Sequence, residues 1–93
     1  MIIGSLTVDI RIPDSHSLKD KRQVVRSLLE GIRGKFNVAS AEIDSLDLLQ
    51  RATLGFVTVA NDRTFVEQVL RKVEEVVESE PRCHIIDSDI EIF

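Results

Sequence analysis

The chain has 93 residues, of which 43% are hydrophobic and 30% charged, and its formal net charge is −4. This length fits one domain near the lower end of sizes that bury a self-sufficient core, and the composition excludes a disordered or low-complexity chain. The charge is unevenly placed: residues 1–40 hold seven Lys/Arg against four Asp/Glu, whereas residues 41–93 hold five against twelve. Net acidity argues against a general nucleic-acid coat, but a local basic surface can still bind phosphate.

No targeting or membrane segment is expected, because Met1 leads directly into an alternating pattern without a basic leader or a long apolar run. We therefore predict a cytoplasmic protein. Cys83 is the one cysteine, so it has no disulfide partner and no second cysteine for a zinc-binding pair. We predict that it is a small packed residue.

The first part of the chain predicts a strand followed by a helix. Apolar and polar residues alternate over 2–12, which is typical of a strand buried on one face. Ser17 is placed to cap a helix in which apolar residues recur every three or four positions as far as Ile32. Gly34 is predicted to end this helix in the left-handed conformation. Lys21 falls near the apolar stripe, and we expect its side chain to reach solvent along the stripe's N-terminal end.

The rest of the chain predicts two strands, a helix and a last strand. The strands are expected at 36–44, 52–60 and 84–93. A loop at 45–51 joins the first two as a hairpin. Asn61 or Asp62 offers a cap for the helix, and Glu80, just before Pro81, ends it.

This order of elements predicts a single α+β domain over residues 1–93 with the ferredoxin-like βαββαβ fold. In that fold both helices pack on one face of a four-stranded antiparallel sheet, and the first and third strands are central. The segment 54–59 is the most apolar strand, which fits a central position. The last strand is the most charged, which fits an edge strand, because charges there prevent pairing with the sheets of other molecules. Apolar residues of both parities occur in 54–59, so one set must face away from the helices.

Cations gather on the polar face of the first predicted helix. At about 100° per residue, Lys19, Arg22, Arg26 and Arg33 fall within about a quarter turn of one another, interrupted only by Glu30. Arg22 and Arg26 are a like-charge i,i+4 pair, which costs a helix about 0.2–0.5 kcal/mol, and an anionic partner would offset that cost. The alternative is a solvated face whose arginines pair with carboxylates of neighbouring loops.

The last strand carries Asp87, Asp89 and Glu91 in a row on one face. Such residues are about 7 Å apart, so consecutive members cannot chelate one ion, and neither His16 nor His84 has a partner at ligand spacing. We predict a solvent-facing edge with no metal and no cofactor. An acidic row on the open face of the sheet would repel phosphate, so nucleic acid should meet the first helix instead.

Signatures of catalysis are not found in the sequence. It holds no Gly-rich phosphate loop, no Cys/His or Ser/His/Asp set and no carboxylates that strand parity would bring together in a cleft. Acylphosphatase shares the topology, but its Gly-rich loop after the first strand is replaced here by Pro13–Ser17. We predict a non-enzymatic protein.

Four segments carry a family resemblance: RIP at 11–13, SLKDKR at 17–22, DLLQRA at 47–52 and NDR at 61–63. With them the chain resembles the small bacterial YlxP-like family, a domain of unknown function, over essentially its whole length. The resemblance implies a ferredoxin-like fold and a bacterial cytoplasmic protein encoded near ribosome-maturation and translation-initiation genes. It supplies no catalytic residues. Family members often have tryptophan where this chain has Leu49, so an aromatic contact from that loop is not expected here.

Two functions are predicted. The first is an accessory protein that contacts structured RNA or a ribosomal particle through Lys19, Arg22, Arg26, Arg33 and Arg51. The second is a homo-oligomeric protein-interaction module that uses the sheet face and the loop residues Leu46, Leu48 and Leu49, unless that loop folds back on the domain. Neither function involves a membrane or a small-molecule ligand.

Overall fold

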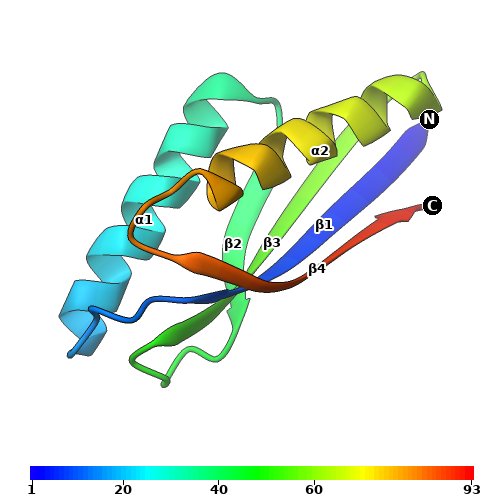
Figure 1. Ribbon diagram of the computed structural model, residues 1–93. Coiled ribbons are helices and arrows are strands. Elements are labelled where there is room, and N and C mark those ends of the chain that lie inside the picture. Colours follow the sequence, from blue (N-terminus) through cyan, green and yellow to red (C-terminus); the bar gives the residue numbers. More distant parts are fainter.

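A computed structural model describes all 93 residues and contains four strands and two helices in the predicted order. The elements are β1 (Ile2–Arg11), α1 (Leu18–Lys35), β2 (Ala39–Asp44), β3 (Arg51–Ala60), α2 (Arg63–Glu78) and β4 (His84–Ile92). The strands form one antiparallel sheet in the order β2-β3-β1-β4, and both helices lie on the same face of it (Figure 1). The ferredoxin-like α+β fold is therefore confirmed, with β1 and β3 central. Neither helix is long and apolar enough to span a bilayer.

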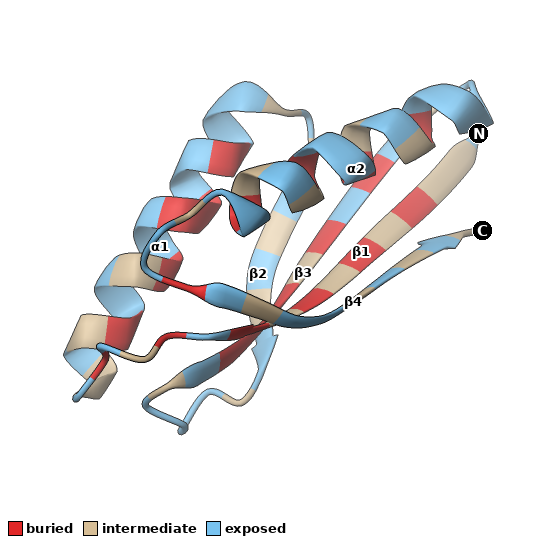
Figure 2. Ribbon diagram, in the orientation of Figure 1, coloured by how far each residue is buried: buried red, intermediate tan, exposed pale blue.

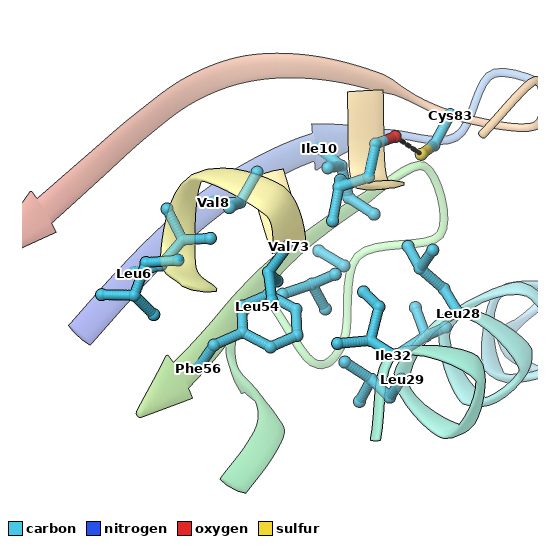
Figure 3. Close-up of a cluster of buried hydrophobic side chains, with 14 of the residues drawn as sticks. Leu6, Val8, Ile10, Leu28, Leu29, Ile32, Leu54, Phe56, Val73 and Cys83 are labelled. Atoms are coloured by element: carbon cyan, nitrogen blue, oxygen red, sulfur yellow. Dashed lines mark hydrogen bonds between the residues drawn. The ribbon is translucent and has the colours of Figure 1, made fainter. Parts of the chain in front are cut away.

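The core lies between the sheet and the helices. In β1, buried Leu6, Val8 and Ile10 alternate with more exposed residues, and this alternation appears as bands along the central strands in Figure 2. Their partners in β3 are Phe56, Leu54 and Ala52, which are equally buried. Figure 3 shows side chains from both helices closing over these strands. Since directly opposed residues share a face, the odd-numbered residues of β1 and their β3 partners lie on the other side, called the open face below.

The two helix starts follow the predicted caps. Ser17 Oγ accepts from the backbone N–H of Asp20 at 3.0 Å, and the Asp20 carboxylate accepts from the N–H of His16 at 3.1 Å. The first bond satisfies a backbone donor that the first turn of a helix leaves free, and the second holds the residue that precedes the cap. Asp62 caps α2 by accepting from the N–H of Thr64 at 3.3 Å.

The predicted end of the first helix is wrong. Helix α1 continues through Gly34 and Lys35, and no glycine has a positive φ. Phe36 caps the helix in an extended conformation, with its N–H donated to the carbonyl of Ile32. Phe36 and Val38 pack against the core, so their burial draws the chain into the sheet without a left-handed turn. Strand β2 consequently starts at Ala39, three residues later than predicted.

Helix α2 approaches the sheet closely at Gly4. A Cβ atom at this position would lie 2.5 Å from Cγ1 of Val66 and 2.9 Å from Cδ1 of Leu70. The absence of a side chain on Gly4 therefore sets how near α2 can come to β1.

Candidate functional site

Lys19, Arg22 and Arg26 lie one turn apart on the exposed side of α1. They line a shallow, open hollow of about 430 Å³ together with Gln23, Ser27 and Glu30. The ion pairs of the chain are Lys21–Glu42, Arg63–Glu67 and Arg82–Glu80, so the three cations have no carboxylate partner. The predicted alternative, in which these arginines pair with loop carboxylates, is not seen. We call Lys19, Arg22 and Arg26 the basic face.

Arg33 lies apart from this hollow. Its Nη1 donates to the carbonyl and the Oγ of Ser40, at 3.3 and 3.2 Å, and so attaches the end of α1 to β2. Arg33 is exposed, but its guanidinium group is used to hold α1 against β2.

Arg82 joins the border of the basic face, although the sequence did not single it out. Its Nη2 donates to Ser27 Oγ at 3.2 Å and to Glu80 Oε1 at 2.9 Å. Hydrogen bonding to the Glu80 carboxylate raises the pKa of Arg82 and lowers that of Glu80. Ser27 and Arg82 are 55 positions apart in the sequence, which explains why no local pattern could place them together.

Lys21 does not reach solvent, so the expectation for its side chain is wrong. It is 1% exposed, and Nζ donates to the carbonyls of Ser45, Leu46 and Arg51 at 2.8, 3.1 and 3.2 Å. These bonds use all three donors of an ammonium group. Glu42 Oε2 lies 2.9 Å from Nζ and supplies the opposite charge without an aligned hydrogen bond. Lys21 therefore fastens the start of α1 to the 45–51 loop.

Arg51 is not part of the basic face. It is the direct partner of Arg11 in the β1–β3 ladder, and both lie on the open face, across the sheet from α1. Leu48 and Leu49 line a hollow with this pair, whereas Leu46 does not. The three loop leucines are 42–58% exposed, so the loop does not bury them by folding back.

An uncharged strip occupies another part of the open face. Val57 and Val59 are 45% and 47% exposed, and Ile43 is 53% exposed where it lies over Gly55. Ala39 pairs with Val57 and Ile3 pairs with Val59, which extends the strip over three strands. The predicted division of β3 into a buried and an outward-facing apolar set is confirmed, and no element of the chain covers the outward set.

The acidic row of β4 borders the open face on the opposite edge. Asp87 pairs with Asp9, whose carboxylate accepts a hydrogen bond from Thr53. Asp87, Asp89 and Glu91 are exposed, and no group of three or more His, Cys, Asp and Glu side chains is arranged to hold a metal ion.

Cys83 is confirmed as a packed residue. It is 3% exposed, and its thiol donates to the carbonyl of Val77 at 3.8 Å, the dashed line in Figure 3. Burial raises the pKa of the thiol, which keeps it protonated and unreactive near neutral pH.

Comparison with known proteins agrees with the family resemblance. Residues 3–90 match the model of a family described as "Protein of unknown function (DUF503)". The chain is 35% identical over 80 residues to "Uncharacterized protein YlxP" of Bacillus subtilis (strain 168), an alignment that covers 86% of this chain and 87% of that protein. The chain therefore belongs to the DUF503 family, which includes YlxP-like proteins and has no assigned function.

Proposed function

We propose that the protein is a non-enzymatic accessory protein that binds structured RNA, free or within a ribosomal particle, through the basic face. The observation that carries the proposal is that Lys19, Arg22 and Arg26 are exposed, adjacent and unpaired in a chain whose net charge is −4. Clustered cations of this kind on one helix face bind phosphate groups electrostatically.

The polar neighbours of the three cations support the same function. Gln23 and Ser27 line the same hollow and can donate hydrogen bonds to phosphate or to a 2′-hydroxyl group. Arg82 borders the hollow through its bond to Ser27, but its charge is balanced by Glu80, so the net positive charge comes from Lys19, Arg22 and Arg26. Glu30 at the end of the hollow limits the proposed contact to the first turns of α1.

Salt dependence of RNA binding tests the proposal. A protein that neutralises three phosphates loses about 20- to 40-fold in affinity between about 50 and 200 mM salt, because counterions are released on binding. We expect a short RNA hairpin, measured by fluorescence anisotropy, to follow this dependence. The double variant Arg22→Glu/Arg26→Glu should abolish binding.

The matched control is Arg71→Glu/Lys72→Glu on α2. Both of these residues are exposed, and the substitutions change the net charge by the same amount. Binding that is equally reduced in both double variants would reflect net charge and would refute a localised interface. Binding that is absent, or unaffected by salt, would refute the function itself.

A second candidate function is self-association through the uncharged strip of Ile3, Ala39, Ile43, Val57 and Val59. Two such strips can pack on each other across a two-fold axis without burying a charge, which makes a second copy of the chain the fitting partner. Sedimentation equilibrium should show a dimer that Val57→Lys/Val59→Lys converts to a monomer. A strict monomer at high concentration would refute this function and leave the RNA proposal unaffected.

A further inference from the structure

Two arginines lie directly opposite each other at one end of the open face. Arg11 and Arg51 are paired in the β1–β3 ladder, both are exposed, and neither belongs to an ion pair within the chain. Like charges directly opposite each other in an antiparallel ladder are destabilising. On its other side Arg11 is paired with His84 of β4, which does not line the same hollow as the two arginines.

The arginine pair borders an apolar surface. Arg11 and Arg51 line a hollow of about 620 Å³ with Gln50 and with three large apolar side chains, Leu48, Leu49 and Ile86. The apolar side chains are 42–50% exposed. Ile86 is the extra residue of a β-bulge, since Ile85 pairs with Ile10 and Asp87 with Asp9. A bulge re-aims a side chain, and this one turns an isoleucine toward the arginines.

The hollow is formed before any ligand arrives. Its loop wall is held by the three carbonyl bonds of Lys21, one of which is to Arg51. Gln50 adds two bonds, accepting from Ile12 N–H at 2.8 Å and donating from Nε2 to the Pro13 carbonyl at 3.3 Å. Because the wall is already ordered, a ligand loses little affinity to loop ordering.

We propose that this hollow binds a peptide segment of a partner protein in which a carboxylate side chain stands next to large apolar side chains. The carboxylate lies between Arg11 and Arg51, whose planar guanidinium groups match it in charge and geometry. The apolar side chains of the peptide cover Leu48, Leu49 and Ile86. This interface lies across the sheet from the basic face and does not depend on RNA binding there.

Charge selects a peptide over a nucleic acid. Asp9 and Asp87 lie one step along the ladders from Arg11, and Asp89 and Glu91 continue the row along β4. The phosphates of a nucleic acid that extended from the hollow along β1 and β4 would be repelled by these carboxylates. A peptide with a single carboxylate held between the arginines places only apolar groups there. The hollow also lacks an aromatic side chain on which a base could stack.

Titration of the ¹⁵N-labelled protein with a synthetic capped peptide containing Phe-Glu-Leu tests the proposal. Saturable shift changes are expected at the amides of Arg11, Gln50, Arg51 and Ile86. A matched Phe-Gln-Leu peptide should bind about tenfold more weakly, since one charge-assisted contact is lost. An Ala-Glu-Ala peptide should be weakened similarly, because the apolar contact is missing.

Two double variants separate this site from the basic face. Arg11→Gln/Arg51→Gln should reduce affinity for the Phe-Glu-Leu peptide about tenfold without lowering the melting temperature, because it removes a like-charge pair. Arg22→Gln/Arg26→Gln should bind the peptide unchanged. Equal binding of the Glu and Gln peptides, no saturable shift at millimolar peptide, or larger shifts at these amides with a short oligouridylate would each overturn the proposal.

Discussion

Lys21 Nζ lies 2.9 Å from Glu42 Oε2, and this contact joins the start of α1 to β2 inside the domain. The same amine donates to three carbonyls that lie 24 to 30 positions further along the chain. One side chain thus holds a helix, a strand and a hairpin loop together. Lys19 and Arg22, on either side of it in the sequence, point to the exposed side of α1 and are free to bind a ligand.

Replacing Lys21 by methionine should strongly destabilise the fold. Methionine keeps the apolar stem but leaves the Glu42 carboxylate without its counter-charge and removes three hydrogen bonds to backbone carbonyls. Breaking a buried ion pair costs about 3–5 kcal/mol. Urea unfolding followed by circular dichroism measures the loss. The matched control is Lys19→Met, which is exposed and should change stability by no more than about 0.5 kcal/mol. Similar effects of the two substitutions would contradict a clamping role for Lys21.

Two glycines should respond to alanine in opposite directions. Gly31 lies on the exposed side of α1, where an added Cβ atom would meet no packed neighbour within 4 Å, so Gly31→Ala should stabilise by about 0.5–1 kcal/mol through helix propensity. Gly4→Ala would place a methyl group 2.5 Å from Val66 Cγ1 and should cost about 1–3 kcal/mol. Thermal and urea unfolding of both variants check the signs. A stabilising Gly4→Ala would show that α2 is free to move away from β1.

The pair Glu80 and Arg82 should contribute a pH-dependent part of the stability. Hydrogen bonds from Arg82 hold the pKa of Glu80 below its ordinary value of 4.5. A carboxylate with a lowered folded-state pKa stabilises the fold above its unfolded-state pKa, and the contribution is lost as pH falls through the folded-state value.

Arg82→Gln should therefore lower stability near pH 7 and make the decline below about pH 4.5 shallower. Urea midpoints at several pH values measure both effects, and added salt should reduce the difference between the variant and the original chain. Parallel pH profiles would contradict the coupling of Arg82 to Glu80.

Local patterns predicted the elements well where one face of a strand or helix is buried. The alternation in β1 and the capping residues Ser17 and Asp62 predicted where these elements begin, and the apolar segment 54–59 agreed with a central place for β3. The end of α1 was mispredicted because Phe36 and Val38, through contacts with the core, decide where the chain leaves the helix. A left-handed preference of Gly34 is a weak local signal beside that burial.

The candidate sites were predicted less completely, because they depend on residues distant in sequence. Helical spacing alone brought Lys19, Arg22 and Arg26 together. The pairing of Arg51 with Arg11 required the β1–β3 register, in which they are direct partners. Lys21 is buried because the 45–51 loop packs against it and supplies carbonyl acceptors. The spacing of residues along α1 contains no information about the position of that loop.

Arg22→Glu should stabilise the protein while it removes RNA binding. Arg22 has Lys19 three residues before it and Arg26 four residues after it, so a glutamate converts two repulsive neighbours into attractive ones. Two repulsive pairs are removed and two attractive pairs are formed, each worth about 0.2–0.5 kcal/mol, so we expect the free energy of unfolding to rise by about 1 kcal/mol in low salt. At high salt the gain should shrink by screening. Urea unfolding and hairpin anisotropy on the same sample measure the two effects. A loss of stability would show that Arg22 serves the fold, and it would remove the reason to ascribe its unpaired charge to a ligand.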